Sequence, residues 1–392
     1  MTKKHILTIY IGRFSPFHNG HGEVLSRAQA RSDAVLVLIG SINQARNPKN
    51  PWTFNERADV IRKWADRPWF TAANGKSPAP VTVLGIRDFP YNDQLWIANV
   101  RKVINQYIET LYVTEECKLQ KVDPINLEIR ITGADRDHST FYLKYFPEFK
   151  LDLVEEDTRV SRFLTATAVR EIYFGRAFNG NEITADHAEL LLKAFLPTET
   201  IDALHTFDKT EMYQELREEH LFNVKYRAPY TPRPALFPDP GLPYEVIFQT
   251  VDAIVVQTGH ILLIKRRSRP GKGLWALPGG FVNPRERLFD AAIRELREET
   301  KIKVPEPILR SSLIFKEDFD YPDRSLRGRT ISKGFLFKLP DFVTDGKIEL
   351  PLVKGADDAE KAMWIPLDEV LKSPELFFED HYNIIEYMLG KL

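Results

Sequence analysis

Three glutamates in the last third of the chain have a spacing that suits a divalent cation. Glu295, Glu298 and Glu299 lie three and four residues apart, so on a helix their carboxylates share one face. Apolar residues at helical spacing predict that helix over residues 287–300. Crowded carboxylates need a counter-charge, and Mg²⁺ prefers oxygen ligands and is often shared with substrate phosphates. The spacing therefore predicts a metal-assisted site that cleaves a pyrophosphate, and the alternative is a solvated acidic helix face.

A longer motif surrounds these glutamates. It begins at Gly280, ends at Ile302, and over these 23 residues resembles the Nudix hydrolase box. The resemblance implies that the metal is bound by Glu295, Glu298, Glu299 and Gly280. Glu298 would also be catalytic. Lys301 stands where the family pattern has Gly, at the point where the helix ends in a left-handed conformation. A residue with a Cβ at this position should lower the stability of the fold by about 1 kcal/mol. The substitution does not alter the metal ligands.

The composition is that of a globular chain with more than one domain. Its 392 residues suggest two or three domains. There are 54 Lys and Arg against 55 Asp and Glu, so no affinity for nucleic acid or anionic membrane is expected. Cys117 is the only cysteine, which excludes an intrachain disulfide and fits a reducing compartment. No stretch suits a signal peptide or a membrane span, so we expect a cytoplasmic protein, with a homo-oligomer left open.

The first half of the chain alternates short β-rich runs with amphipathic stretches. The strand-like runs are ILTIYI, DAVLVLIG, VTVLGI, LEIRITG and LDLVEE, and helical patterns lie near 54–65, 94–109 and 166–174. This alternation predicts an α/β fold with a parallel sheet, which binds ligands beyond the carboxyl ends of its strands. We therefore expect the functional residues of this half to follow the strands.

Two histidines follow the first strand. His18 and His21 stand beside Gly20 where a helix should begin, so imidazole and backbone N–H groups would surround one anion. This arrangement predicts a phosphate site. The alternative is that both histidines are ordinary polar turn residues.

Several segments together resemble the nicotinamide mononucleotide (NMN) adenylyltransferases of the archaeal type, which also occur fused to Nudix domains. GRFSPFHNGH (12–21) is similar to the nucleotidylyltransferase signature, and the further segments are 40–61, 91–96, 132–137 and 164–170. The resemblance covers about the first 180 residues. It implies that the two histidines bind the triphosphate of ATP, with Mg²⁺ carried largely by that triphosphate, and that Arg170 neutralises the leaving pyrophosphate.

The same resemblance implies a set of substrate-binding residues. In chain order they are Gly12, Arg13, Phe14, Asn43, Arg57, Trp96, Gly133, Asp135, Arg136, Thr165 and Thr167. Trp96 would stack on the nicotinamide, and the turn at Thr165 and Thr167 would open a helix toward the phosphates. Arg136 stands where the family usually has Lys, so a planar fork replaces a compact point charge.

The chain divides into three expected parts. Residues 1–182 form a Rossmann-like nucleotidylyltransferase domain, 183–243 a helical extension with a proline-rich linker, and 244–392 a Nudix α/β/α sandwich with a mixed sheet. Segments beyond the Nudix box resemble those that line an ADP-ribose pocket in related proteins. There, Arg324, Arg327 and Arg329 could hold a diphosphate, or could form a solvated basic loop. Asp358 is a candidate general base or extra ligand. The other acids not excluded are Asp357, Glu360 and Glu317.

The two resemblances predict a bifunctional enzyme. One half would make NAD from NMN and ATP, and the other would hydrolyse ADP-ribose to AMP and ribose 5-phosphate, with Mg²⁺ or Mn²⁺ in the Nudix site. One alternative is an adenylyltransferase for another mononucleotide, joined to a hydrolase of NADH or dinucleoside polyphosphates. A non-catalytic ADP-ribose sensor is the other alternative, although its glutamates would typically be degraded, whereas all of them are present here.

Overall fold

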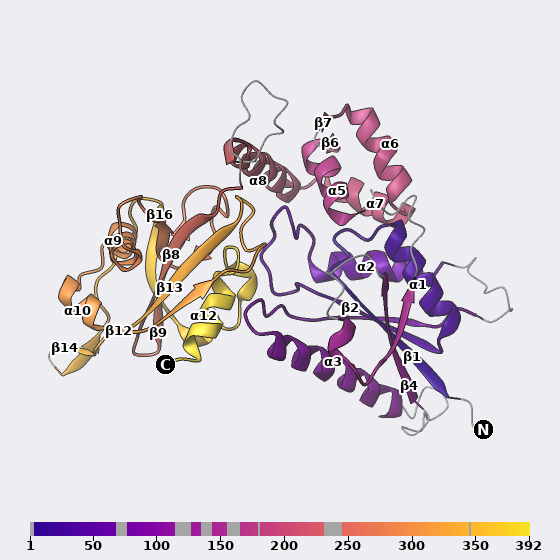
Figure 1. Cartoon of the computed structure of the whole chain (residues 1–392), viewed down its shortest axis with the longest axis horizontal. Coiled ribbons are helices and arrows are strands. Elements are labelled where there is room, and N and C mark those ends of the chain that lie inside the picture. Colours follow the sequence, from indigo (N-terminus) through magenta and orange to yellow (C-terminus); the bar gives the residue numbers. More distant parts are fainter. Residues whose placement is uncertain are drawn as a thin grey trace. The chain divides into compact units, whose positions relative to one another are not determined.

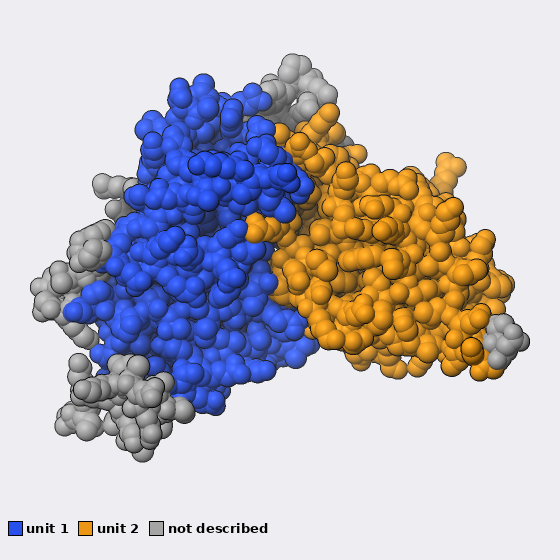
Figure 2. Space-filling view, turned by 180° about the vertical axis from the view of Figure 1, so that it is seen from behind, with its two compact units in different colours: residues 1–42, 48–217 blue, residues 43–47, 218–392 orange. Residues whose placement is uncertain are grey.

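The computed structural model describes residues 4–67, 77–113, 127–134, 143–154, 165–178, 181–230, 245–344 and 346–392. The chain forms two compact units. One comprises residues 1–42 and 48–217, and the other comprises residues 43–47 and 218–392 (Figure 2). The helical extension expected over 183–243 is thus divided, because its residues up to 217 group with the first unit and those from 218 with the second.

The first unit is built on a five-stranded parallel sheet in the order β3-β2-β1-β4-β5 (Figure 1). Its strands are β1 (His5–Gly12), β2 (Ala34–Ile39), β3 (Val81–Gly85), β4 (Leu127–Ala134) and β5 (Lys150–Val154). Every residue of β2 is buried, as expected for a central strand covered on both faces. The α/β fold with a parallel sheet, predicted from the alternating pattern, is confirmed.

Helices cover both faces of this sheet. α1 (Asn19–Arg31) and α2 (Phe54–Ala65) share one apolar cluster with Val35, Val37 and Ile39 of β2. The longer α3 (Asp93–Val113) packs on the other face, against Leu36 and Leu38 (Figure 1). The alternation of side chains along β2 therefore feeds two separate cores, and the carboxyl ends of the strands stay open to loops.

The remainder of the first unit is mostly helical. It contains α5 (Ala166–Arg170), one π-helical turn (Glu171–Gly175), the short strands β6 (Ala177–Phe178) and β7 (Asn181–Glu182), α6 (Ala185–Phe195), α7 (Thr198–Phe207) and the first turns of α8 (Glu211–Arg227). A short 3-10 turn, Ala228–Tyr230, follows α8. These elements pack around an aromatic cluster that includes Trp52 and Phe174. Trp52, which directly precedes α2, thereby joins the helical part to the sheet.

The second unit contains a mixed sheet. Its central path is β10-β9-β8-β13-β12, with β11 on β8 and β16 on β9. The strands are β8 (Phe248–Gln257), β9 (His260–Arg266), β10 (Trp275–Ala276), β11 (Gly279–Phe281), β12 (Leu313–Phe319), β13 (Thr330–Lys338) and β16 (Ala359–Pro366), with the separate hairpin β14 (Phe342–Thr344) and β15 (Lys347–Glu349). The helices are α9 (Leu288–Thr300), α10 (Glu306–Ser311), α11 (Leu367–Val370), α12 (His381–Leu389) and a 3-10 turn, Pro374–Leu376.

Local chemistry accounts for two features of this sheet. β8 and β9 form the predicted hairpin, and its two turn residues, Thr258 and Gly259, have the positive φ angles that a tight hairpin requires. β13 runs parallel to β8, whereas β9, β11 and β16 pair antiparallel with their neighbours. The predicted mixed sheet is therefore confirmed. Within the residues described, no helix combines the length and apolar character needed to cross a bilayer.

Candidate active sites

The two predicted histidines lie together where β1 leads into α1. His18 is the N-cap of α1, and the two residues cap one another. The Nδ1 atom of His18 accepts the N–H of His21 at 3.4 Å, and Nδ1 of His21 accepts the N–H of His18 at 3.2 Å. The rings stack with centroids 3.6 Å apart. Because both Nδ1 atoms act as acceptors, each neutral ring carries its proton on Nε2, where it can serve as a donor.

The loop before the histidines has a constrained conformation. Phe14 is buried and has φ of 49°, and a Cβ added at Gly12 would lie 2.8 Å from its ring. Glycine is therefore required at position 12 by the fold of the loop. The Phe14 ring also contacts the His21 ring edge-on at 5.0 Å. Gly12 and Phe14, predicted to bind substrate, thus shape the loop that carries the histidines.

Two arginines place positive charge at the same loop. Arg170 is 8% exposed and donates to the Ser15 carbonyl at 2.6 Å and to Thr167 Oγ1 at 3.2 Å. Burial, and to a lesser degree the charge of Arg13, lowers the pKa of Arg170 to about 9. Neither guanidinium forms an ion pair with a carboxylate of the described residues. Thr165, also predicted, caps α5 by accepting the Ala168 N–H. Glu171 offsets part of the charge of Arg170, and an anion at this loop would neutralise more of it.

Arg57, predicted to bind substrate, is bonded to backbone carbonyls of the protein. It is 3% exposed, and its guanidinium donates to the carbonyls of Arg13 and Gly40 at 2.8 and 2.9 Å and to those of Ser41 and Thr53 at longer range. Burial lowers its pKa to about 10. These bonds tie the loop after β1 to the loop after β2, so its substrate contact stays a prediction.

The remaining predicted residues of this half lie on different elements of the chain. Trp96 lies in the first turn of α3, is half-buried, and packs on Phe146 with centroids 6.1 Å apart. Gly133 is buried in β4, and Asn43 is buried in the loop after β2. Asp135 and Arg136 lie outside the described residues, so their roles stay predictions.

In the second unit, the glycine turn and α9 bring the predicted metal ligands together. The N–H of Gly279 donates to Glu299 Oε2 at 2.9 Å. A Cβ on Gly280 would lie 2.6 Å from Oε1 of Glu295, so only glycine lets this carboxylate approach β11 so closely. Glu299 is 4% exposed, and the side chain of Glu298 is 44% exposed. Arg294 pairs with Glu295 and Glu298 at 2.7 and 3.0 Å, and also with Glu286.

The charges at this site suit a hard divalent cation. The pKa of Glu299 is raised to about 8, mainly by burial and also by the carboxylates of Glu295 and Asp358, against the lowering effect of the Gly279 N–H. Burial also raises the pKa of Glu295, with added repulsion from Glu298 and Asp357. Within the described residues, Arg294 takes up part of this acidic charge, and no three His, Cys, Asp or Glu side chains form a ready-made cluster. All the donors are nevertheless oxygens, and a cation would relieve their repulsion, so the residues fit Mg²⁺ or Mn²⁺.

The segment that carries Asp357 and Asp358 lies against the end of α9. Lys354 and Ala356 donate their N–H groups to the carbonyls of Thr300 and Glu299, at 2.7 and 3.0 Å. This pairing brings Asp358 into the field of Glu299, and Asp357 into that of Glu295. Both acids are exposed. Glu317, the other acid with a described contact, accepts the Tyr387 hydroxyl. Which acid acts as base stays a prediction.

The three predicted diphosphate-binding arginines lie in three different environments. Arg324 is 7% exposed and forms a bidentate pair with Asp380 at 2.8 and 2.9 Å. Arg329 donates to the carbonyl of Asp320. Arg327 lies over the rings of Phe281 and Phe378, at 5.3 and 5.8 Å, and its ion pair with Glu379 is long, at 3.8 Å. The idea of a solvated basic loop therefore does not describe Arg324, which is committed to the interior.

Two residues that sequence reasoning missed lie beside this site. Arg266, at the end of β9, stacks over Phe378 at 4.2 Å, and its charge acts on Glu299. Glu219, on α8, accepts the N–H of Gly271 at 3.0 Å, in the loop that follows Arg266. For Arg266, the sequence signal that could have been used is the Arg266-Arg267 pair at the end of a predicted strand. No local pattern marks Glu219, because its partner is 52 residues away.

Comparison with known proteins agrees with this pair of sites. The family model for Cytidylyltransferase-like proteins matches residues 9–148, and that for the NUDIX domain matches residues 247–388. A crystal structure of a bifunctional NMN adenylyltransferase/ADP ribose pyrophosphatase from Francisella tularensis, complexed with AMP and a Mn ion, is 30% identical. The alignment covers 98% of this chain and 99% of the Francisella tularensis chain, with a TM-score of 0.77. The chain belongs to this bifunctional family.

Two further relatives are each named for one of these activities. A nicotinamide/nicotinic acid mononucleotide adenylyltransferase from Acinetobacter baylyi is 29% identical over 220 residues, which is 56% of this chain and 93% of that protein. An ADP-ribose pyrophosphatase from Methanocaldococcus jannaschii is 37% identical over 141 residues, or 36% of this chain and 73% of that protein.

Lys301 gives a first prediction for this member of the family. It has φ of 47° and ψ of 31°, the left-handed conformation expected where the Nudix pattern has Gly. Lys301→Gly should therefore raise the free energy of unfolding by about 1 kcal/mol. Chemical denaturation would measure the gain, and Lys301→Ala, which keeps the Cβ, should show none. An unchanged stability in Lys301→Gly would mean that the left-handed conformation is not strained here.

Glu219 gives a second prediction. Glu219→Ala would leave the Gly271 N–H without its acceptor and free the loop beside Arg266, so stability should fall by about 1–3 kcal/mol. The KM for the diphosphate substrate should rise more than kcat falls. Glu218→Ala is the matched control, because the side chain of that neighbour is 61% exposed and, among the described residues, forms an ion pair only with Arg269. Equal effects of both changes on KM would argue against a positioning role for Glu219.

The raised pKa of Glu299 gives a third prediction, which concerns the pH dependence of cation binding. A cation binds the carboxylate, so affinity should rise up to about pH 8, and binding below that pH should release about one proton. Without cation, the folded protein keeps this proton between its ordinary pKa of 4.5 and about 8, while the unfolded chain has lost it. Stability should therefore fall as pH rises through that window. Calorimetry in buffers of different ionisation enthalpy measures the proton release, which Glu299→Gln should abolish.

Proposed function

We propose that the first unit transfers AMP from ATP to NMN, giving NAD and pyrophosphate. A phosphate oxygen of NMN attacks the α-phosphorus of ATP, the bond from that phosphorus to the bridging oxygen breaks, and pyrophosphate leaves. No covalent intermediate with the protein is needed, so positioning and positive charge supply the catalysis. The observation that carries this proposal is the stacked His18–His21 pair with Arg13 and Arg170 at the same loop.

Each of these residues has a role that follows from its bonds. The Nε2–H groups of His18 and His21 would donate to the phosphates, because their Nδ1 atoms are held by backbone N–H groups. Arg170 is fixed by the Ser15 carbonyl, so it presents charge to the leaving pyrophosphate at little cost in side-chain entropy. Mg²⁺ would enter with the triphosphate of ATP.

We further propose that the second unit hydrolyses ADP-ribose to AMP and ribose 5-phosphate. Glu295, Glu298, Glu299 and the backbone of Gly280 would hold Mg²⁺ or Mn²⁺, which when bound polarises the diphosphate and activates water. Arg266 and Arg327, both against Phe378, would hold the diphosphate, and Asp358 would accept a proton from the attacking water. The buried Glu299, with Glu295 beside Gly280, carries this proposal.

One substrate panel on the purified full-length protein tests both proposals. ATP should be offered with NMN or with nicotinic acid mononucleotide, and ADP-ribose, NAD, NADH and diadenosine polyphosphates should be compared at equal concentration with Mg²⁺. We expect NAD from the first set, and AMP with ribose 5-phosphate from ADP-ribose in the second. Preference for NAD, NADH or a diadenosine polyphosphate would overturn the hydrolase proposal. If ATP gave no dinucleotide with NMN or with nicotinic acid mononucleotide, the adenylyltransferase proposal would be overturned.

A further inference from the structure

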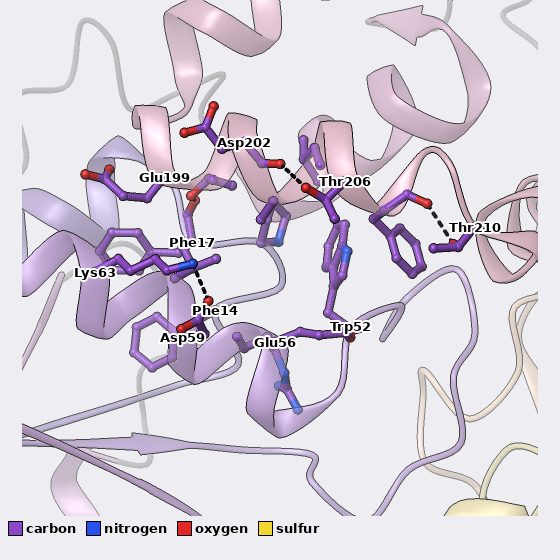
Figure 3. Close-up of a pocket in the computed structure, with 17 residues that line it drawn as sticks. Phe14, Phe17, Trp52, Glu56, Asp59, Lys63, Glu199, Asp202, Thr206 and Thr210 are labelled. Carbon is purple, nitrogen blue, oxygen red and sulfur yellow. Dashed lines mark hydrogen bonds and ion pairs between the residues drawn. The ribbon is translucent and has the colours of Figure 1, made fainter.

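A cavity of about 340 Å³ lies in the first unit between α2 and α7 (Figure 3). Phe14, Pro16 and Phe17 from the loop after β1 line it together with Trp52. Its other apolar lining residues are Val60, Ala203, Leu204 and Phe207. The phosphate-site residues Arg13, His18, His21 and Arg170 are not among the residues that line it. The cavity therefore shares Phe14 and Arg57 with the predicted nucleotide site, but not the histidines, Arg13 or Arg170.

The charged side chains that line this cavity are mostly acidic: Glu56, Asp59, Glu199 and Asp202 against Arg57 and Lys63. Asp59 and Lys63 come from α2, and Glu199 and Asp202 from α7, with the Trp52 side chain between the two helices (Figure 3). Lys63 pairs with Asp59 at 2.7 Å, and Glu199 pairs with Arg67. Asp202 forms no ion pair with a residue in the described part of the chain, although its charge acts on Lys63 at longer range. The rim therefore keeps negative charge that a cation would neutralise.

The interior of the cavity suits a flat apolar group. Four of its lining residues, Phe14, Phe17, Trp52 and Phe207, are aromatic, and the volume is at the lower end of the range of small-molecule sites. Aromatic faces also attract a cation that has lost part of its water. We propose that this cavity binds a small aromatic amine, with its ring among these side chains and its ammonium group at the acidic rim.

An occupant of this cavity would press on the loop that carries the histidines. Phe14 and Phe17 both contact the His21 ring, with centroids 5.0 and 5.7 Å apart. Thr200 of α7 donates its hydroxyl to the Phe17 carbonyl at 2.8 Å, so α7 is bonded to the same loop. A bound amine would therefore alter the rate of AMP transfer and leave ADP-ribose hydrolysis unchanged. This coupling rests on the function proposed for the first unit, whereas the binding itself does not.

Calorimetry on the full-length protein tests the binding. Phenethylamine is the probe, and 3-phenylpropionate has a similar body with the opposite charge. We expect one equivalent of amine to bind at least about tenfold more tightly than the acid. Asp202→Asn should lower the affinity for phenethylamine about threefold, the effect expected for the loss of one exposed charge pair. Asp186→Asn, on the exposed first turn of α6, is the matched control and should change nothing. Ala203→Phe should fill the cavity and abolish binding.

Three results would overturn the site: no binding of phenethylamine, equal binding of 3-phenylpropionate, or unchanged binding in Ala203→Phe. If Ala203→Phe does not fold, the comparison of Asp202→Asn with Asp186→Asn decides, and equal affinities would count against the site. The coupling has a separate readout. Saturating phenethylamine should change the rate of NAD formation by at least about twofold in the wild-type protein but not in Ala203→Phe. If phenethylamine bound without changing the rate of NAD formation, the binding site would be supported and the coupling would be overturned.

Discussion

Glu299→Gln is expected to lower ADP-ribose hydrolysis by at least about a hundredfold while NAD synthesis continues at its normal rate. The glutamine keeps the size of the side chain, and its amide oxygen can still accept the Gly279 N–H. What it removes is the negative charge of a carboxylate that is 4% exposed and repelled by Glu295 and Asp358. The variant should be folded, because a neutral side chain at this buried position avoids the cost of burying a charge.

The control for this experiment is Asp290→Asn on the same helix. Asp290 lies in the first turn of α9 and pairs with Arg310 at 2.8 Å, away from the metal ligands. Both variants should be assayed for both reactions with Mg²⁺ and with Mn²⁺. Hydrolysis by Glu299→Gln within about tenfold of the wild type would show that Glu299 is structural and that the cation is held by other groups.

Local patterns made much of the fold predictable. The helix expected near 54–65 is α2, Phe54–Ala65, and the helix expected over 287–300 is α9 with its N-cap at Arg287. Both have an apolar stripe at helical spacing, and α2 also begins at a Thr53–Glu56 capping box, which are properties of consecutive residues. The left-handed Lys301 was predictable for the same reason, since the family pattern specifies the conformation of one position.

Partners distant in sequence were not predictable. Arg324 is one of three similar arginines in a loop, but Asp380, 56 residues later, accepts hydrogen bonds from its Nε and Nη2 atoms. Arg57 similarly bonds four carbonyls from three segments, which no spacing reveals. For α8, periodicity indicates a helix but does not say which unit each of its turns joins. Glu219 is therefore visible only once its bond to Gly271 is known.

The histidine pair supports the largest effect in the first unit. His18→Asn should lower NAD synthesis by about a hundredfold or more, as when one transition-state donor is removed, and leave ADP-ribose hydrolysis unchanged. Asparagine is chosen because His18 is the N-cap of α1, and Asn is a favoured N-cap whose oxygen can accept the His21 N–H. The change thus removes the imidazole Nε2 donor and keeps the helix start. His18→Ala removes both, so it should cost about 1 kcal/mol more in stability with a similar loss of activity.

His21 allows the chemical role to be separated from packing. Its ring contacts Phe14 and Phe17 as well as His18, so His21→Phe would preserve an aromatic ring there while removing both nitrogens. We expect His21→Phe to lose NAD synthesis as severely as His18→Asn does, with kcat falling more than KM rises, because donation to the phosphates strengthens in the transition state. Steady-state kinetics for both reactions in both variants would measure this. If His21→Phe kept more than about a tenth of the activity, the ring would serve to pack the loop, and phosphate stabilisation would have to come from Arg13 and Arg170 alone.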